Sequence, residues 1–312
     1  LTGRRIIFVL VIVSAYFLVD RGASILLRHA IDASPFRYSR LYSQKSTAPI
    51  ALFGNSRGVQ AFYQPDLERS FCQQVDNLAF NGLSMEVVES LIKDRMDRDP
   101  APRSIIVEMS ALNADPRAID LMVPYIEKSN RLLDQYEKQY QNFARTSWLS
   151  HSRIFNSELS FRALYYLLGG SDQHWIIRDR TITDGMKIPF QAAATPGDFS
   201  GLNLGGLYDV DPAVLGTISR IATEGLRHGV DFYFVLAPYH PVITKSAAPQ
   251  IDKFVNAVRQ LNLRNVNVID ASRALSDDKL FADRVHTNLE GSQALLSWLL
   301  KSGVFTKLNN CR

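Results

Sequence analysis

The hydrophobic positions of this chain alternate between short apolar runs and longer segments with apolar residues three and four apart. The short runs are typical of buried strands. They fall at Ile50–Phe53, Val75–Leu78, Ile105–Val107, Phe232–Leu236 and Val266–Ile269. Helical spacing lies between them, at Met85–Met96 and at Pro212–His228, where Gly229 is a suitable stop. Alternating strands and helices predict an α/β fold in which a parallel sheet is flanked by helices in three layers.

The N-terminal segment has a different pattern, because Arg4 and Arg5 precede the almost wholly apolar stretch Ile6–Val19. This stretch alone is short for a hydrocarbon core of about 30 Å, but continuing it to Leu27 supplies the length. A cleaved signal peptide is the alternative, although no convincing small-x-small cleavage site follows the apolar run. We therefore expect an uncleaved transmembrane helix. Its basic pair favours a single-pass protein of the inner (cytoplasmic) membrane whose main domain faces the periplasm or the cell exterior.

A long interval between the third and fourth predicted strands breaks the alternation and is rich in Tyr, Arg and Gln. It is typical of a cap inserted into one large domain. Trp148 and Trp175 in this interval either stack on sugar rings or pack the cap's own small core. The predicted organisation is a membrane anchor over 1–30, a linker over 31–47 and an α/β domain over 48–312, with the helical cap at 115–204.

Charge and composition exclude some classes of function. The net charge is +4 over 312 residues, and no basic run with interleaved aromatics indicates nucleic acid. The histidines lack the mutual spacing of a metal cluster, so we expect no metal. The two cysteines, Cys72 and Cys311, either form a disulfide in an exported domain or are unrelated thiols.

The chemistry-bearing residues lie near the two ends of the predicted α/β domain. Ser56 follows the first apolar run at Gly54, so it lies at the carboxyl end of a strand. His286 precedes a segment of helical spacing, and Asp283 lies three residues before it. A serine hydroxyl needs an imidazole to accept its proton, and the imidazole needs an acceptor on its other nitrogen. The three residues therefore predict a Ser-His-Asp triad.

This arrangement resembles the SGNH (GDSL-like) hydrolase superfamily, in which a serine follows the first strand and an Asp-x-x-His motif precedes the last helix. The resemblance covers about residues 48 to 303. It implies that Ser56 is the nucleophile, that His286 is the general base and acid, and that Asp283 orients the histidine. It also implies an SGNH-like, flavodoxin-like three-layer fold and chemistry without a cofactor.

The same resemblance implies an oxyanion hole formed by the amide of Ser56, the amide of Gly82 and a third-block asparagine. In this chain Ser110 stands roughly where that asparagine falls, and Asn113 comes slightly later, so we expect Asn113 to be the third donor. The chain also departs from the usual Gly-Asp-Ser, because it has Asn55 before the serine.

Other interpretations of the same residues remain. The stretch from Gly54 to Gly58 also matches the G-x-S-x-G nucleophile elbow of α/β-hydrolases, although that elbow normally follows several strands. Arg57 either binds an acidic group of the substrate or pairs with a nearby carboxylate. His240, just after the fourth predicted strand, either contacts substrate or shapes its loop.

The resemblance implies a serine esterase or O-acyltransferase outside the cytoplasm, acting on acyl esters, above all acetyl esters, of a cell-envelope or secreted polysaccharide. Water as acceptor makes the protein an esterase, and a sugar hydroxyl makes it a transferase. The alternative is a catalytically inactive scaffold of the same fold that binds polysaccharide or a membrane partner. The expected partners are an acylated polysaccharide, the membrane and a membrane protein of an envelope assembly, but no nucleic acid.

Overall fold

This computed structural model describes residues 3–34, 36–43, 46–110, 116–140 and 210–311. The chain forms two compact units. One comprises Leu1–Gln44 with Ile119–Asp172, and the other comprises Lys45–Ala118 with Gln173–Arg312. Trp148 and Trp175, and most of the interval predicted to be a cap, lie outside the described residues.

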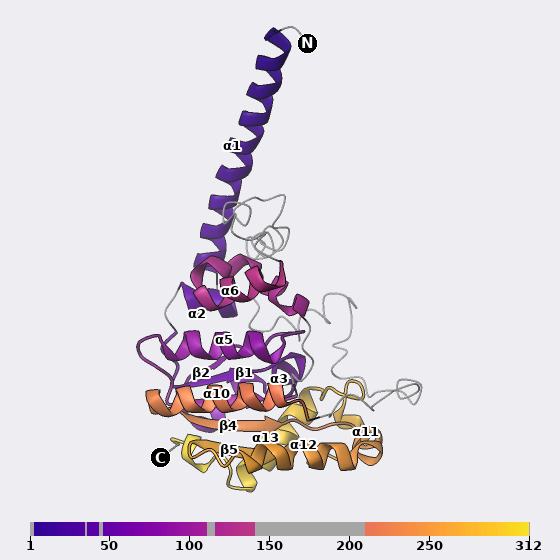
Figure 1. Ribbon diagram of the computed structural model, residues 1–312. Coiled ribbons are helices and arrows are strands. Elements are labelled where there is room, and N and C mark those ends of the chain that lie inside the picture. Colours follow the sequence, from indigo (N-terminus) through magenta and orange to yellow (C-terminus); the bar gives the residue numbers. More distant parts are fainter. Residues whose placement is uncertain (1–2, 35, 44–45, 111–115, 141–209, 312) are drawn as a thin grey trace. The chain divides into compact units, whose positions relative to one another are not determined.

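The larger unit is built on a parallel sheet of five strands in the order β2-β1-β3-β4-β5 (Figure 1). The strands are β1 (Ile50–Phe53), β2 (Val75–Asn77), β3 (Ser104–Glu108), β4 (Asp231–Leu236) and β5 (Val266–Asp270). The predicted α/β class and parallel sheet are confirmed. Since β1 pairs with both β2 and β3, the chain reverses its direction across the sheet at β1. Ligand sites of such sheets lie beyond the carboxyl ends of the strands at this point.

One face of the sheet is covered by helices from the beginning and the end of the domain. These are α3 (Ser56–Ala61), α4 (Gln64–Phe71) and α13 (Leu289–Lys301). Because side chains alternate along a strand, every second residue contributes to this core. Ile50, Leu52, Ile106, Tyr233, Val235 and Ile269 pack there with Leu295 and Leu299 of α13.

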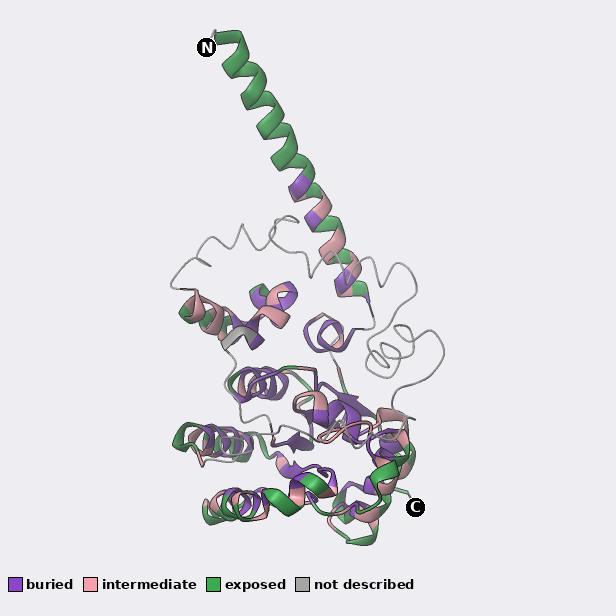
Figure 2. Ribbon diagram, turned by 90° about the vertical axis from the view of Figure 1, so that its right-hand side faces the viewer, coloured by how far each residue is buried: buried purple, intermediate pink, exposed green. Residues whose placement is uncertain are grey.

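The opposite face is covered by α5 (Met85–Met96), α10 (Pro212–His228) and α12 (Ala248–Gln260). Both α10 and α12 carry buried and exposed residues (Figure 2), whereas α5 is buried along most of its length. The helix α10 approaches the sheet closely at Gly225, where an added Cβ would lie 2.0 Å from the ring of Phe232. It ends at Gly229, which adopts the left-handed conformation with φ +67°. The predicted bounds of α5 and α10 are confirmed.

The smaller unit contains the N-terminal helix α1 (Gly3–Ala33), followed by α2 (Arg37–Tyr42), most of the 3-10 helix η1 (Pro116–Lys128) and α6 (Asn130–Gln139). Among the described residues, α1 is the one helix long and apolar enough to cross a membrane. Its apolar side chains between Ile6 and Val19 are largely exposed. The helix continues to Ala33, and α2 is buried, so structured helix occupies part of the segment predicted to be a linker.

Tyr125 of η1 is buried against α2. Its ring is edge-on to Tyr38 and stacked on Tyr42, with centroids 5.7 and 6.0 Å apart. Its hydroxyl shares a hydrogen bond of 3.1 Å with Ser39, whose own hydroxyl donates to the carbonyl of Ile31. These contacts hold the end of α1, α2 and η1 together.

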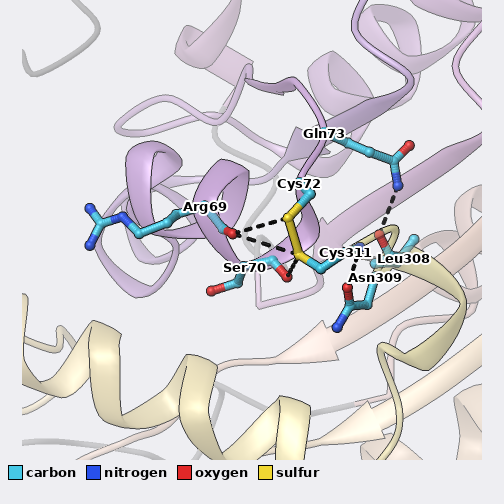
Figure 3. Close-up of a disulfide and its surroundings, with 7 residues drawn as sticks. All are labelled: Arg69, Ser70, Cys72, Gln73, Leu308, Asn309 and Cys311. Carbon is cyan, nitrogen blue, oxygen red and sulfur yellow. Dashed lines mark hydrogen bonds between the residues drawn. A yellow bond between two sulfur atoms is a disulfide. The ribbon is translucent and has the colours of Figure 1, made fainter.

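Cys72 and Cys311 form a disulfide in the larger unit (Figure 3). The sequence had left this pairing open. Cys72 ends α4 in the left-handed conformation. Two hydrogen bonds support the same junction, from the amide of Asn310 to the carbonyl of Phe71 at 2.9 Å and from the side chain of Gln73 to the carbonyl of Leu308 at 2.8 Å.

The disulfide should stabilise the α/β unit, because it closes a loop of 239 residues. We expect the double variant Cys72→Ser/Cys311→Ser to lose about 2–5 kcal/mol of unfolding free energy. Denaturant titration with and without dithiothreitol measures this loss. Reductant should lower the parent's midpoint toward that of the variant and leave the variant unchanged. A parent insensitive to reductant would contradict the expectation.

Candidate active site

Ser56 is placed at the carboxyl end of β1 by a sharp strand-to-helix turn. Gly54 ends the strand with φ +149°, a conformation that favours glycine. Asn55 caps α3, since its side-chain oxygen accepts a hydrogen bond of 2.9 Å from the amide of Arg57. Ser56 is therefore the first helical residue and is half-buried. Amides in the first turn of a helix have no intrahelical acceptor, so the Ser56 amide suits an oxyanion.

The buried side chain of Glu108, at the end of β3, supports this turn. An added Cβ on Gly54 would lie 2.8 Å from its Cβ, and one on Gly58 would lie 3.2 Å away. Its carboxylate accepts hydrogen bonds from the amide and hydroxyl of Ser110 and from the amide of Ala237. Small residues at positions 54 and 58 thus let the Ser56 turn lie directly on β3.

Asp283 and His286 lie in a tight hairpin just before α13. The amide of Ala282 donates to the carbonyl of His286 at 2.9 Å, and Phe281 forms an antiparallel bridge with Thr287. The Asp283 carboxylate also organises the turn, because its Oδ1 accepts from the amides of Val285 and His286, each at 2.9 Å. The motif is therefore a preorganised hairpin.

The hairpin is packed against the start of α13. Asn288 caps the helix by accepting from the amide of Gly291 at 2.8 Å, and its side-chain nitrogen donates to the carbonyl of Lys279 at 2.5 Å. An added Cβ on Gly291 would lie 2.0 Å from the carbonyl oxygen of Leu280. This close approach requires glycine at position 291 and fixes the hairpin against the helix.

The structure brings together the three residues predicted to form the triad. Ser56 Oγ lies 2.9 Å from His286 Nε2, and His286 Nδ1 lies 2.8 Å from Asp283 Oδ2. All three side chains are partly buried. These are the contacts by which a histidine accepts a serine proton while a carboxylate fixes its tautomer. The site can therefore activate the Ser56 hydroxyl.

Asp283 is held in its charged form. Burial favours the neutral acid and raises the pKa of its carboxyl group. The hydrogen bond and charge of His286 and the two backbone amides outweigh burial and lower this pKa from the ordinary 3.8 to about 2. The carboxylate is thus available to His286 over the whole pH range in which most proteins stay folded.

The predicted oxyanion donors have different outcomes. Gly82, with φ +75°, is exposed in the loop after β2, and β2 pairs with β1, so Gly82 follows a strand that ends at the same sheet edge as the strand before Ser56. Its role as a donor remains a prediction. Asn113 lies outside the described residues. Ser110 stands roughly where the third-block asparagine is expected. Its hydroxyl and its amide both donate to the Glu108 carboxylate.

Arg57 and His240, the two residues proposed to bind substrate, point into the protein. Arg57 is 5 % exposed, and its guanidinium lies over the ring of Tyr239. His240 is 2 % exposed and caps α11 (Pro241–Ser246) by accepting from the amide of Val242. Their burial agrees with the structural roles that the sequence left open, and contact with substrate stays a prediction. The Arg57 side chain donates to backbone carbonyls of the loop after β4.

Two hydroxyl contacts that join α13 to α3 were not predicted. Thr287 Oγ1 donates to the carbonyl of Gln60 at 3.2 Å, and Ser292 Oγ donates to the carbonyl of Ala61 at 3.0 Å. Hydroxyl groups near a helix start are usually caps, so local sequence gives no signal for such long-range bonds. They connect the start of α13 and the residue Thr287 before it to the end of α3.

One group of possible metal ligands occurs among the described residues, away from the triad in the sequence. Asp97, Glu224 and His228 have ligand atoms within 4.8 Å of one another. His228 Nε2 lies 3.7 Å from Asp97 and 3.4 Å from Glu224, distances that are also usual between neighbouring side chains at a surface. These partly exposed contacts account for the group without an ion.

The chain was also compared with known proteins. No family model matches it, and no match was found among curated proteins. The interpretation of the site therefore depends on its geometry.

The low pKa of Asp283 predicts a pH-dependent part of stability. Because the folded pKa of about 2 is below the ordinary 3.8, the charged carboxylate stabilises the fold above about pH 4. This stabilisation is lost as pH falls through 2. We expect Asp283→Asn to cost about 1–2 kcal/mol at pH 6, allowing for partial solvent screening, and much less near pH 2.

Denaturant titrations of the parent and the variant across this pH range measure the difference. Asp252→Asn is a matched control, because Asp252 makes an exposed ion pair with Arg273. A difference between the parent and Asp283→Asn that stays constant with pH would contradict the assigned role of the carboxylate.

Proposed function

We propose that this protein is a serine acyl-transfer enzyme that uses Ser56, His286 and Asp283. The observation that carries the proposal is the continuous contact from Ser56 Oγ through the His286 ring to the Asp283 carboxylate. The order of these residues and the parallel sheet support membership of the SGNH hydrolase superfamily. The position of Ser56 after the first strand argues against an α/β-hydrolase elbow.

In the first half-reaction, Ser56 Oγ attacks an ester carbonyl while His286 Nε2 accepts its proton. Charge develops on the carbonyl oxygen, toward which we propose that the amides of Ser56 and Gly82 and the side chain of Asn113 donate. The bond to the leaving alcohol then breaks, and His286 returns the proton to that alcohol. The products are an acyl-serine and a free hydroxyl compound.

In the second half-reaction, His286 takes a proton from water or from a sugar hydroxyl, whose oxygen attacks the acyl-serine. Collapse of the tetrahedral intermediate releases Ser56, which recovers its proton from His286. Water yields a carboxylic acid, and a sugar yields a new ester. Both outcomes use the same triad, so the acceptor that reaches the acyl-serine decides between esterase and O-acyltransferase.

We propose that the substrate is an acyl ester, above all an acetyl ester, of a cell-envelope or secreted polysaccharide. Two observations support an extracytoplasmic site. The described part of the chain carries one helix suited to crossing a membrane, with Arg4 and Arg5 before its apolar stretch, and Cys72 and Cys311 form a disulfide. Membrane-bound relatives of the superfamily that the chain resembles often modify such polymers.

A serine-reactive fluorophosphonate tests the nucleophile directly. We expect the detergent-solubilised chain to gain one adduct on Ser56, seen by peptide mass spectrometry. Ser56→Ala should abolish the adduct, and His286→Ala should slow labelling by at least about 100-fold, because the general base is lost. Aryl-acetate turnover should likewise be abolished by Ser56→Ala and strongly slowed by His286→Ala. Parent turnover at the background level of both variants, with Ser56 unlabelled, would instead favour the binding scaffold.

The membrane assignment has its own test. We expect carbonate extraction of membranes to leave the full-length chain in the pellet, because α1 is apolar over most of its length. A cysteine-reactive impermeant reagent, applied to spheroplasts after reduction, should label Cys72 or Cys311. Release of a shortened soluble form would show that the N-terminal segment is cleaved, and labelling restricted to lysed cells would contradict the orientation.

A further inference from the structure

The loop 237–240, between β4 and α11, connects the two halves of the candidate site. One side of the loop contacts Arg57, which follows Ser56 in the chain. The other side contacts Arg284, which lies inside the Asp283–His286 hairpin. Each contact is within two residues of a member of the triad. The loop is thus a bridge between segments separated by more than 200 residues.

The Arg57 side chain makes three contacts with the loop 237–240. Its Nη2 donates to the carbonyl oxygens of Ala237 and Pro238, the latter at 2.9 Å. The guanidinium carbon lies 3.2 Å from the centroid of the Tyr239 ring. A buried guanidinium is stabilised when its N–H groups donate to acceptors and its charged plane stacks on an aromatic ring.

The loop itself is fixed to the sheet. The amide of Ala237 donates to Glu108 Oε1 at 3.3 Å, and the amide of Tyr239 donates to the carbonyl of Ser272 at 3.1 Å. Both Ala237 and Tyr239 are buried. The loop 237–240 is therefore held to the sheet, and it limits the movement of the Arg57 side chain.

On the hairpin side, the amide of His240 donates to the carbonyl of Arg284 at 3.2 Å. The ring of His240 is edge-on to Phe281, with centroids 5.2 Å apart, and its Nε2 lies 3.1 Å from Asp278 Oδ1 without alignment for a hydrogen bond. Burial lowers the pKa of His240, and the Asp278 charge opposes this only in part. The neutral ring thus acts by packing and capping.

We propose that Arg57 is a positioning residue: by holding the loop 237–240, which in turn holds Arg284, it sets the distance between Ser56 Oγ and His286 Nε2. This inference rests on the proposed function for its kinetic consequence, but not for its geometry. A shift of about 1 Å between reacting groups is enough to cost roughly 100-fold in rate. Arg57 needs no contact with substrate to have this effect.

The kinetic test compares the full chain with Arg57→Lys and Arg57→Gln. Lysine keeps the charge but loses the planar fork, and glutamine loses both the charge and the stacking. We expect the rate constant for fluorophosphonate labelling of Ser56 to fall about 10- to 100-fold, while the fraction finally labelled stays that of the parent. With an aryl acetate, kcat should fall and KM should stay nearly constant.

Two further variants make the test specific. Arg273→Gln removes an exposed arginine of the same unit that pairs with Asp252, and it should leave the labelling rate unchanged. If Arg57→Gln does not fold, Tyr239→Leu removes the stacking surface and should slow labelling, whereas Tyr239→Phe should restore the rate. A folded Arg57→Gln, or a folded Tyr239→Leu, that labels at the parental rate overturns the proposal.

A spectroscopic test separates this proposal from the proposed function. In protein with ¹⁵N-labelled histidine, Ser56→Ala should shift the His286 Nε2 resonance, since it removes the hydrogen bond. We expect this shift to be much smaller when Arg57→Gln is already present. An equal shift in both backgrounds overturns the positioning role even if the parent is inert to fluorophosphonate. If Ser56→Ala does not shift the His286 Nε2 resonance in the otherwise unchanged protein, the Ser56–His286 contact is absent. That result overturns both proposals.

Discussion

The packing of α13 against α3 is the contact on which the candidate site depends. Ser56 begins one helix, and His286 lies in the hairpin that leads into the other, 230 residues later in the chain. Their reacting atoms meet because the hydroxyls of Thr287 and Ser292 bind carbonyls of α3 and because both helices bury apolar residues on one sheet face. The site is thus a product of tertiary packing, although each of its parts is local.

The difference between local structure and tertiary packing explains what could be predicted from the sequence. Apolar runs identify the five strands because a buried parallel strand has a local signature, and Gly229 marks the end of α10 for a similar reason. Ser56, Asp283 and His286 were found because their types and order are typical of one chemistry. Spacing along the chain could not show whether Cys72 meets Cys311.

The sequence left the roles of Arg57 and His240 open, because the features that bury them come from elsewhere in the chain. The carbonyls and aromatic ring that receive Arg57 lie about 180 residues away, on a loop that local patterns identify only as the end of a strand. A charged residue beside a serine suggests substrate binding when its environment is unknown. In the folded domain its donors face inward, and the same is true of His240, which caps a short helix.

The disulfide has a consequence for the order in which the domain matures. Because the chain is synthesised from its N-terminus, Cys72 emerges long before Cys311, which lies 239 residues later. Ser56 likewise emerges well before His286. Until His286 and Cys311 have been synthesised, the serine hydroxyl has no imidazole beside it and α4 has no covalent link to the final segment. The meeting of Ser56 with His286 and the covalent closure of the domain are therefore both late events, because each needs the last part of the chain.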